Sequence, residues 1–262
     1  MKRLIVNADD LGVGERRNDG IVEAHLRGIV TATSVIVNGD AFDHAVDLLG
    51  KTSSLDAGLH LNLSEGRPVG EEYRTLVDAD GDFFGKEESR RKADEGAFDP
   101  DEIERETEAQ WKRLVEQGVE PSHIDSHQHI HIYGKVFEPV VRVARNHGVR
   151  FVRLPDEPSD GTERMEEYRT HVEKAKAEFP AGGVDAFFGM TLTGCMSRER
   201  VLELVENLDE GVTELMVHPG FADEPAGFSG PDREGELQVL TDAGLRHQIE
   251  EAGIELVRFR DL

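Results

Sequence analysis

Aspartate and histidine side chains gather at a few places in the sequence, each just after an apolar run. Two adjacent aspartates, Asp9 and Asp10, follow the apolar residues 4–6, and single histidines stand at His60 and His218. A further group is spaced by twos: His123, Asp125, His127, His129 and His131. Imidazole and carboxylate groups together suit zinc, nickel or cobalt, or magnesium with more water ligands. Two histidines and one carboxylate with open coordination positions can bind and activate water.

The two adjacent aspartates could divide two tasks in a hydrolytic reaction. Neighbours at a strand end point to different sides, so one can bind metal while the other faces the attacking water. Metal lowers the pKa of water from ~15.7 toward ~7, and a carboxylate can then take its proton. His218 is the candidate acid for the leaving group. Considered without the histidines, Asp9 and Asp10 would fit a turn or a helix cap as well as a catalytic site. The alternative for His218 is a structural His–Pro turn.

The elements that must position these residues alternate regularly between strands and helices. Strands are expected at 4–6, 34–37, 57–63, 123–126, 149–154, 184–188, 213–217 and 254–259. Helices are expected at 16–27, 42–49, 101–117, 135–147, 163–178 and 198–208, with one more inside 233–251. The alternation predicts an α/β fold. Seven or eight units in 262 residues favour a single TIM-like (β/α) barrel, regular or distorted, that forms one domain over 1–262.

Active sites of such barrels form at the carboxyl ends of the strands, where the four clusters would meet at one rim. A strand cannot stay extended from residue 123 to residue 131, so only some of its polar residues can converge there. The segment 64–100 is rich in Gly, Asp and Glu and is too long for an ordinary connection. It is expected to be an insertion or lid with local structure of its own.

Charge and composition narrow the classes of partner. The chain has 54 acidic and 30 basic residues, a net charge of −24, and a single cysteine. This acidic coat is typical of a protein from a halophile and disfavours nucleic acid and anionic membranes as partners. One cysteine excludes an internal disulfide framework and a Cys-based zinc site. No apolar stretch is long enough for a membrane span or a signal-peptide core, so a cytoplasmic location is expected.

The motifs resemble those of the YdjC-like carbohydrate deacetylases, a family that includes the chitooligosaccharide deacetylases. The resemblance runs in order along the chain through Asn7-Ala8-Asp9-Asp10-Leu11-Gly12, Val30-Thr31-Ala32-Thr33-Ser34, Gly58-Leu59-His60, residues 123–131 and Val217-His218-Pro219. One departure is Leu11, where many members have Phe. The resemblance implies a (β/α) barrel, often distorted, that hydrolyses an N-acetyl group of an amino sugar and releases acetate.

The resemblance also implies a role for each candidate residue. Asp10, His60 and His127 would bind one divalent metal ion, Asp9 would be the general base and His218 the general acid. Apart from the resemblance, Asp125, His129 and His131 are expected to contact substrate or to orient the ligands. The ion would be Mg²⁺ or Zn²⁺, with Ni²⁺ and Co²⁺ as further candidates. The implied partner is a small N-acetylated sugar, and the resemblance points to a homodimer, which the acidic surface neither supports nor excludes.

Two other functions fit the same residues. A metal-dependent esterase or phosphoesterase could use the same scaffold, and Arg153, near a strand end, keeps a phosphoesterase open although the motifs carry no basic residue. A non-catalytic carbohydrate-binding protein is the third alternative. Such a binder would not need Asp9 beside Asp10, nor an acid to serve a leaving group.

Overall fold

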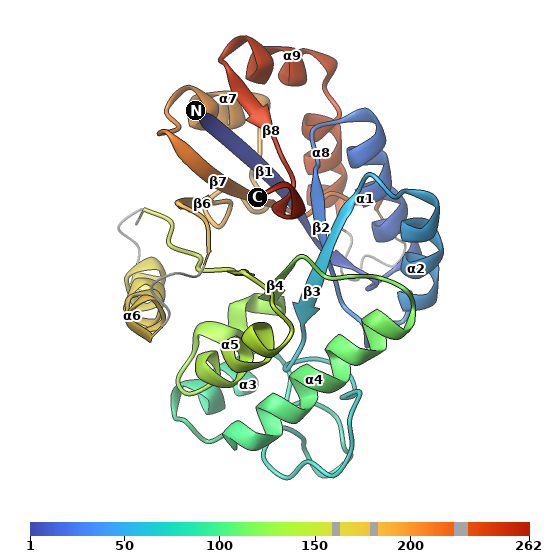
Figure 1. Ribbon diagram of the computed structural model, residues 1–262, viewed down its shortest axis with the longest axis vertical. Helices are drawn as coiled ribbons and strands as arrows, with labels where there is room; N and C mark the ends of the chain where they lie inside the picture. Colours follow the sequence, from blue (N-terminus) through green and yellow to red (C-terminus); the bar gives the residue numbers. More distant parts are fainter. Residues whose placement is uncertain (159–162, 179–182, 223–229) are drawn as a thin grey trace. The chain divides into compact units, whose positions relative to one another are not determined.

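The computed structural model describes residues 1–158, 163–178, 183–222 and 230–262 (Figure 1). These residues form two compact units: unit 1 spans Met1–Val35, Asp40–Ala57 and Val184–Leu262, and unit 2 spans Ile36–Gly39 and Gly58–Gly183. Parallel strands alternate with helices along both, so the predicted α/β class, a distorted TIM-like fold, is confirmed. The assignment of residues 1–262 to a single domain stays a prediction.

Unit 1 is built on a parallel sheet with β1 (Lys2–Leu11) at its centre. β1 lies between β2 (Ala32–Val35) and β7 (Gly211–Val217); β6 (Ala186–Phe188) pairs with β7, and β8 (Ile254–Leu256) pairs with β1. The β1 side chains Leu4, Ile5 and Val6 have no exposed surface. A strand covered on both faces has a continuous apolar run, which is the pattern that predicts this strand.

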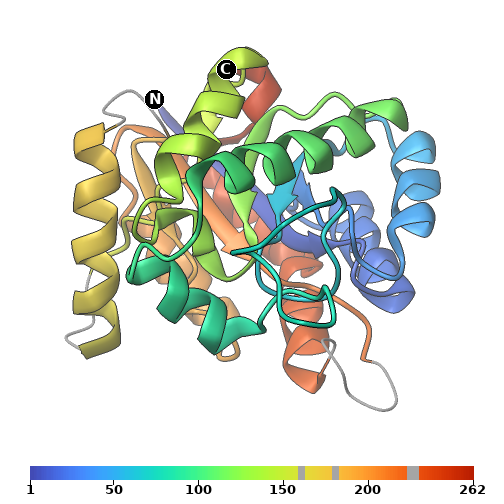
Figure 2. The ribbon, with the colours of Figure 1, turned by 90° about the horizontal axis from the view of Figure 1, so that it is seen from below.

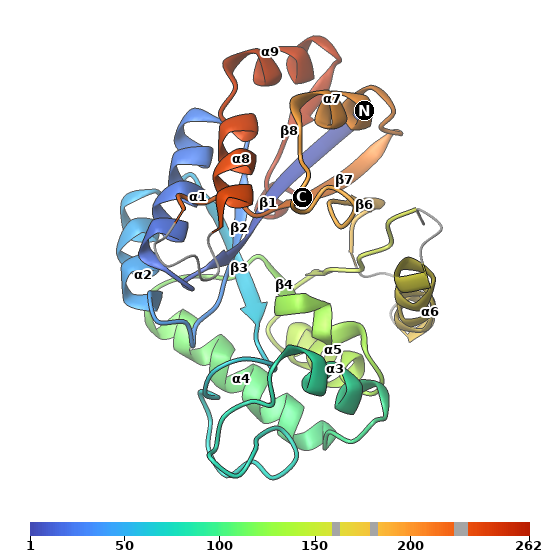
Figure 3. The ribbon, with the colours of Figure 1, turned by 180° about the vertical axis from the view of Figure 1, so that it is seen from behind.

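The helices of unit 1 pack against one another in two groups. They are α1 (Glu15–Arg27), α2 (Phe42–Lys51), α7 (Arg198–Glu206), α8 (Pro231–Leu240) and α9 (Ala243–Glu251), followed by a 3-10 turn at Phe259–Asp261. α1 packs beside α2 and α8, and α7 packs beside α9 (Figure 3). Two helices, α8 and α9, occupy the range 233–251, in which one helix was expected. The chain stops and restarts there because the Asp242 carboxylate accepts a hydrogen bond from the Leu245 amide and caps α9.

Unit 2 carries the other three strands, paired in parallel in the order β3, β4, β5. They are β3 (Asp56–Leu61), which enters the unit at Gly58, β4 (His123–Ser126) and β5 (Phe151–Val152). Its helices are α3 (Lys86–Asp94), α4 (Pro100–Glu116), α5 (Phe137–Asn146) and α6 (Glu163–Glu178), with a short helical segment η1 (His127–Ile132). α4 packs along α5 (Figure 2). No helix in the described ranges is long and apolar enough to cross a membrane.

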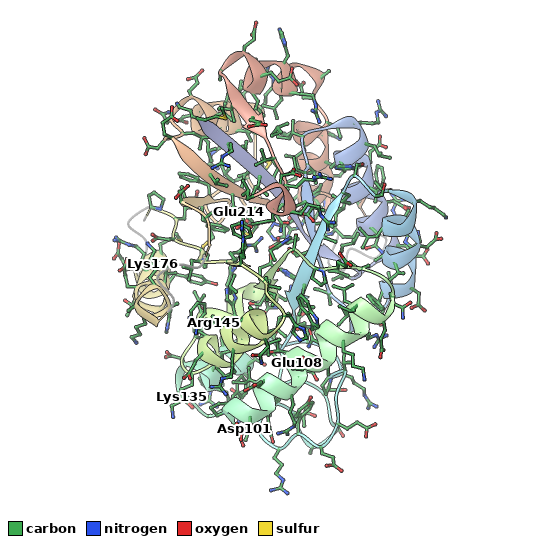
Figure 4. All side chains as sticks on the ribbon, viewed as in Figure 1. Asp101, Glu108, Lys135, Arg145, Lys176 and Glu214 are labelled. Carbon is green, nitrogen blue, oxygen red and sulfur yellow. The ribbon has the colours of Figure 1, made fainter. Side chains whose placement is uncertain are left out.

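The segment 64–100 has local structure, as expected, and two buried carboxylates attach it to α4. Glu102 accepts hydrogen bonds from the amides of residues 74 and 75, and Glu106 from those of residues 69 and 70, at 2.8–2.9 Å. The more exposed face of α4 carries other acidic residues, such as Asp101 and Glu108 (Figure 4). Hydrogen bonds to ionised carboxylates are stronger than neutral ones, so the contacts of Glu102 and Glu106 hold the backbone of the segment on α4. A role of this segment as a lid stays a prediction.

A glycine in the middle of α1 allows close contact with the segment that follows β7. A Cβ atom on Gly20 would lie 2.5 Å from the Cα atom of Gly220 and 2.8 Å from the amide nitrogen of Phe221. Real side chains do not approach backbone atoms so closely. Gly20 therefore lets α1 pack directly on the residues just after His218. The cost is a weaker helix, because glycine has a low helix propensity.

We expect Gly20→Ala to destabilise the protein by about 1–3 kcal/mol, because the new methyl group forces α1 away from the segment after β7. The measurement is urea unfolding in high-salt buffer. The control is Gly50→Ala, because Gly50 lies in α2 with open space around its Cβ position. That change should stabilise the protein by up to about 1 kcal/mol. Equal stability gains in both variants would refute the packing argument.

Candidate functional site

The register between β1 and β7 brings predicted site residues of unit 1 to the same level. Ala8 pairs with Val217, so Asp9 and His218 come next on their neighbouring strands. Both strands are parallel and end at this edge of the sheet. The structure therefore brings the predicted base and acid together at the carboxyl ends of β1 and β7, where parallel α/β folds place their chemistry.

The two aspartates make different contacts, as expected of neighbours at a strand end. Both are buried, with 2% and 3% of their surface exposed. Asp9 accepts a hydrogen bond from the side-chain amide of Asn7 at 2.8 Å, and this amide also donates to the Ser34 hydroxyl at 2.7 Å. Asp10 has a φ of 72°, a left-handed conformation that costs a non-glycine residue about 1–2 kcal/mol. Such strain is typical of functional sites.

A buried arginine that the sequence analysis missed lies beside Asp10. The Arg17 Nη1 atom is 3.6 Å from Asp10 Oδ2, and the arginine side chain has no exposed surface. The same nitrogen donates to the backbone oxygen of His218 at 3.4 Å. Burial lowers the pKa of Arg17, and the Asp10 carboxylate acts against this shift. Arg17 thus supplies counter-charge to the aspartate and links it to the strand end that carries His218.

His218 is a half-buried imidazole between charged neighbours. Its backbone amide donates to Glu236 Oε2 at 2.6 Å, and Glu236 in turn is paired with Arg233. Burial lowers the pKa of His218, while the carboxylates of Asp10 and Glu236 favour its protonated form. The Nδ1 atom has no hydrogen-bond partner among the described residues. A ring with an unused nitrogen beside a carboxylate can carry a proton to or from a bound molecule.

In unit 2, a buried carboxylate joins His60 to an arginine. His60 and Asp125 are direct partners across β3 and β4. His60 Nδ1 lies 2.6 Å from Asp125 Oδ1, and Arg153 Nη2 lies 2.7 Å from Asp125 Oδ2, with all three side chains at most 2% exposed. Burial alone would raise the pKa of Asp125, but Arg153 and His60 more than offset this and hold the pKa well below its ordinary value.

This contact decides which nitrogen of His60 can bind a metal. A carboxylate bonded at Nδ1 holds the proton there and directs Nε2 outward as the ligand atom, as is usual for metal-binding histidines. The phosphoesterase alternative rested on Arg153 near a strand end. Arg153 is 3% exposed and its charge is neutralised by Asp125, so the structure gives no support to its binding a phosphate.

The run of alternating histidines bends as soon as β4 ends, as the sequence predicted. β4 stops at Ser126, and Gln128 and His129 both have left-handed backbone, with φ of 58° and 55°. His123, at the start of β4, packs instead over Gly58, whose Cβ would lie 2.4 Å from its ring. Because of this bend, the remaining histidines of the run lie in different surroundings.

His127 faces His60 and a glutamate that the sequence analysis missed. The two imidazole rings lie 5.6 Å apart between centroids, and His127 Nε2 is 3.5 Å from Glu65 Oε2. Glu65 is held by Gln128, whose side-chain amide donates to Oε1 at 2.7 Å. In the sequence, Glu65 is marked by its position alone: it follows the carboxyl end of the strand that carries His60.

His129 and His131 are buried deeper and serve the surroundings of the bend. His129 packs edge-on against the Tyr168 ring, and burial lowers its pKa well below the ordinary value. His131 lies 2.5 Å from the Ser126 hydroxyl through Nδ1 and 2.8 Å from the backbone oxygen of Arg153 through Nε2. A bond to a carbonyl oxygen requires the proton on Nε2, so His131 donates to Arg153 and ties the bend to the residue that follows β5.

The structure thus collects the predicted residues in two groups. Asp9, Asp10 and His218 lie together in unit 1, and His60, Asp125, His127, His129 and His131 lie together in unit 2. Each group contains buried carboxylates together with imidazole groups, which are buried in unit 2 and half-buried at His218. Both kinds of group bind divalent metals.

Comparisons with known proteins agree along nearly the whole chain. Residues 3–251 match the family described as YdjC-like protein. The chain is 38% identical to a Mus musculus protein named carbohydrate deacetylase, over 99% of this chain and 94% of that protein. It is 34% identical to the chitooligosaccharide deacetylase of Salmonella typhimurium, over 99% and 98%. A solved structure from Enterococcus faecalis V583, described as a putative cellobiose-phosphate cleavage protein, has a TM-score of 0.82, 26% identity, and coverage of 99% and 98%.

The low pKa of His131 predicts acid sensitivity. Burial lowers this pKa from 6.5 to about 4, so below pH 6.5 the unfolded chain takes up a proton that the folded protein does not. Stability should therefore fall as the pH drops from 6.5 toward about 4, and no further through this group below that. One such proton changes the unfolding free energy by about 1.4 kcal/mol per pH unit.

We expect His131→Gln to reduce this slope by close to one proton, measured by urea unfolding at several pH values with EDTA present. His247→Gln is the control, because the His247 side chain is 69% exposed on α9. An unchanged slope in His131→Gln would contradict the prediction, even if the variant is less stable at every pH.

Proposed function

Because the chain belongs to the YdjC-like protein family, we propose that it is a carbohydrate deacetylase, a hydrolase that removes N-acetyl groups from amino sugars such as chito-oligosaccharides. The observation that carries the proposal is full-length similarity to proteins named for this activity, joined to buried Asp and His residues at the expected positions. The substrate is a small N-acetylated sugar.

The proposed ligands of one divalent ion are Asp10, His60 and His127, three buried side chains of the kinds that bind divalent metals. The donor chemistry fits, because Asp125 holds His60 with Nε2 as the ligand atom. The bound ion would polarise the acetamide carbonyl and lower the pKa of the attacking water. Mg²⁺, Zn²⁺, Ni²⁺ and Co²⁺ are all compatible with these ligands.

The remaining residues move and hold protons. Asp9 acts as the general base, and its carboxylate is oriented for this by the Asn7 amide. His218 acts as the general acid and donates to the departing amine, which leaves poorly unless it is protonated. The carboxylates of Asp10 and Glu236 favour the protonated ring that this step needs. Asp125 positions His60, while His129 and His131 support the bend that carries His127.

The test is acetate release from N-acetylated chito-oligosaccharides by protein purified in high salt and loaded with each candidate ion. We expect release by the wild type and a loss of about 10²–10⁴-fold in kcat for Asp9→Asn, because the general base is removed. Cleavage of a phosphoester without any acetate release would refute the deacetylase proposal. Full turnover by Asp9→Asn would refute the assignment of the base.

A measurement of metal retention distinguishes a metal ligand from the general base. After desalting, His60→Ala should lose the ion that the wild type retains, because one of three ligands is missing, while Asp9→Asn should keep it. Elemental analysis of metal per protein chain measures both. Loss of metal in Asp9→Asn with retention in His60→Ala would overturn the choice of ligands.

A further inference from the structure

The bend after β4 is an unfavourable backbone shape that something must hold. Gln128 (φ 58°, ψ 18°) and His129 (φ 55°, ψ 30°) are consecutive non-glycine residues in the left-handed region. Residues other than glycine visit this region as single residues, and of these two types only histidine is enriched there. The bend starts directly after His127, so it determines where that imidazole points.

Two side chains from distant elements meet at the peptide oxygen inside the bend. Arg90 of α3 donates from Nη2 to the Gln128 oxygen at 2.8 Å, and Tyr168 of α6 donates from its hydroxyl to the same oxygen at 3.2 Å. The arginine bond is shorter and carries a full charge, so it is the stronger of the two. Arg90 also lies 5.9 Å from the centroid of the Tyr133 ring.

The other contacts of the bend fix its two sides. Ser126 Oγ accepts a hydrogen bond from the His131 amide at 3.1 Å, which closes the loop from 126 to 131. The Gln128 side chain reaches Glu65, which stands 3.5 Å from His127 Nε2. The Gln128 oxygen is therefore the point at which α3, part of the segment 64–100, controls the backbone next to His127.

We propose that Arg90 is a positioning residue for His127. Its guanidinium holds the Gln128 oxygen, keeps the left-handed bend, and thereby fixes the His127 imidazole where it can bind metal. This inference rests on the proposed function, in which His127 is a ligand. It gives the segment 64–100 a task at the site that does not require it to move as a lid.

The surroundings of Arg90 supply a matched control and a means of rescue. Arg91, the next residue, pairs instead with Glu88 and Glu95 on the exposed side of α3. A cavity of about 490 Å³ is lined by Arg90, Tyr133, Tyr168 and charged residues of α3. A shortened side chain at position 90 would leave a space that a free guanidinium ion can enter from this cavity.

The experiment titrates Co²⁺ as probe into the metal-free protein and follows binding by calorimetry and the visible spectrum. Arg90→Ala should bind Co²⁺ about 10-fold more weakly than the wild type, the lower end of the loss seen when a direct partner of a ligand is removed, because Arg90 acts on His127 through the backbone. Millimolar guanidinium should restore part of this affinity. Arg90→Lys, which keeps a charged donor, should lie between the two. Arg91→Ala should bind like the wild type.

The outcomes separate this inference from the proposed function. If the wild type binds Co²⁺ and His60→Ala does not, but Arg90→Ala binds normally, only the positioning role is refuted. Equal losses in Arg90→Ala and Arg91→Ala, or no response to guanidinium, would likewise mean a general effect on α3. If the wild type and His60→Ala alike bind no Co²⁺, the metal site itself is refuted, and the role of Arg90 with it. Should Arg90→Ala fail to fold, Arg90→Lys decides alone.

Discussion

The buried Asp125 carboxylate is the interaction on which the candidate site depends most. It is fully enclosed, so its charge is tolerable only because His60 and Arg153 each satisfy one oxygen. Removing one partner from such a buried group typically costs about 3–5 kcal/mol, since an uncompensated charge remains. The same bond that makes the carboxylate tolerable also sets the tautomer of His60. Stability and ligand geometry are therefore fixed by one contact and cannot be altered separately.

Other parts of unit 2 build on this contact. The backbone of Arg153 accepts from His131, and His131 closes the bend that follows β4 through Ser126. The bend in turn presents His127 beside Glu65. Buried polar networks of this kind are favourable only when each member is satisfied, and each additional bond makes the others more specific. In unit 1, Arg17 plays the comparable part for Asp10, as a buried cation that reaches both aspartate and strand end.

The sequence predicted those features that depend on local pattern. The covered strand β1 shows as an apolar run, and polar residues in the last part of β1 and of β3 and directly after β7 mark the candidate residues of each unit. The end of β4 at Ser126 was also predictable, since so many consecutive polar residues cannot remain in one buried strand. The break between α8 and α9 was missed, although Asp242 is a good capping residue, because apolar residues continue on both sides of it.

Features that depend on long side chains from distant segments could not be predicted. Arg90 and Tyr168 are 38 and 40 positions from Gln128, and nothing in the local sequence announces a left-handed conformation at Gln128 and His129. Arg17 and Glu65 act through reach and burial, which a linear pattern does not encode. β5 is only two residues long, a length that the apolar pattern over 149–154 did not indicate.

The attachment of the segment 64–100 to α4 has an evolutionary consequence. Glu102 and Glu106 accept hydrogen bonds from main-chain amide groups, and every residue other than proline has such an amide. Mutations at residues 69 and 74 can therefore change side chains without releasing the segment. Residues 70 and 75 are more restricted, because a Cβ atom at Gly70 would clash with the Tyr73 hydroxyl and the Thr75 hydroxyl itself donates to Glu102. Such an arrangement lets a lineage try new surface chemistry on this segment while two glutamates on a stable helix preserve its course.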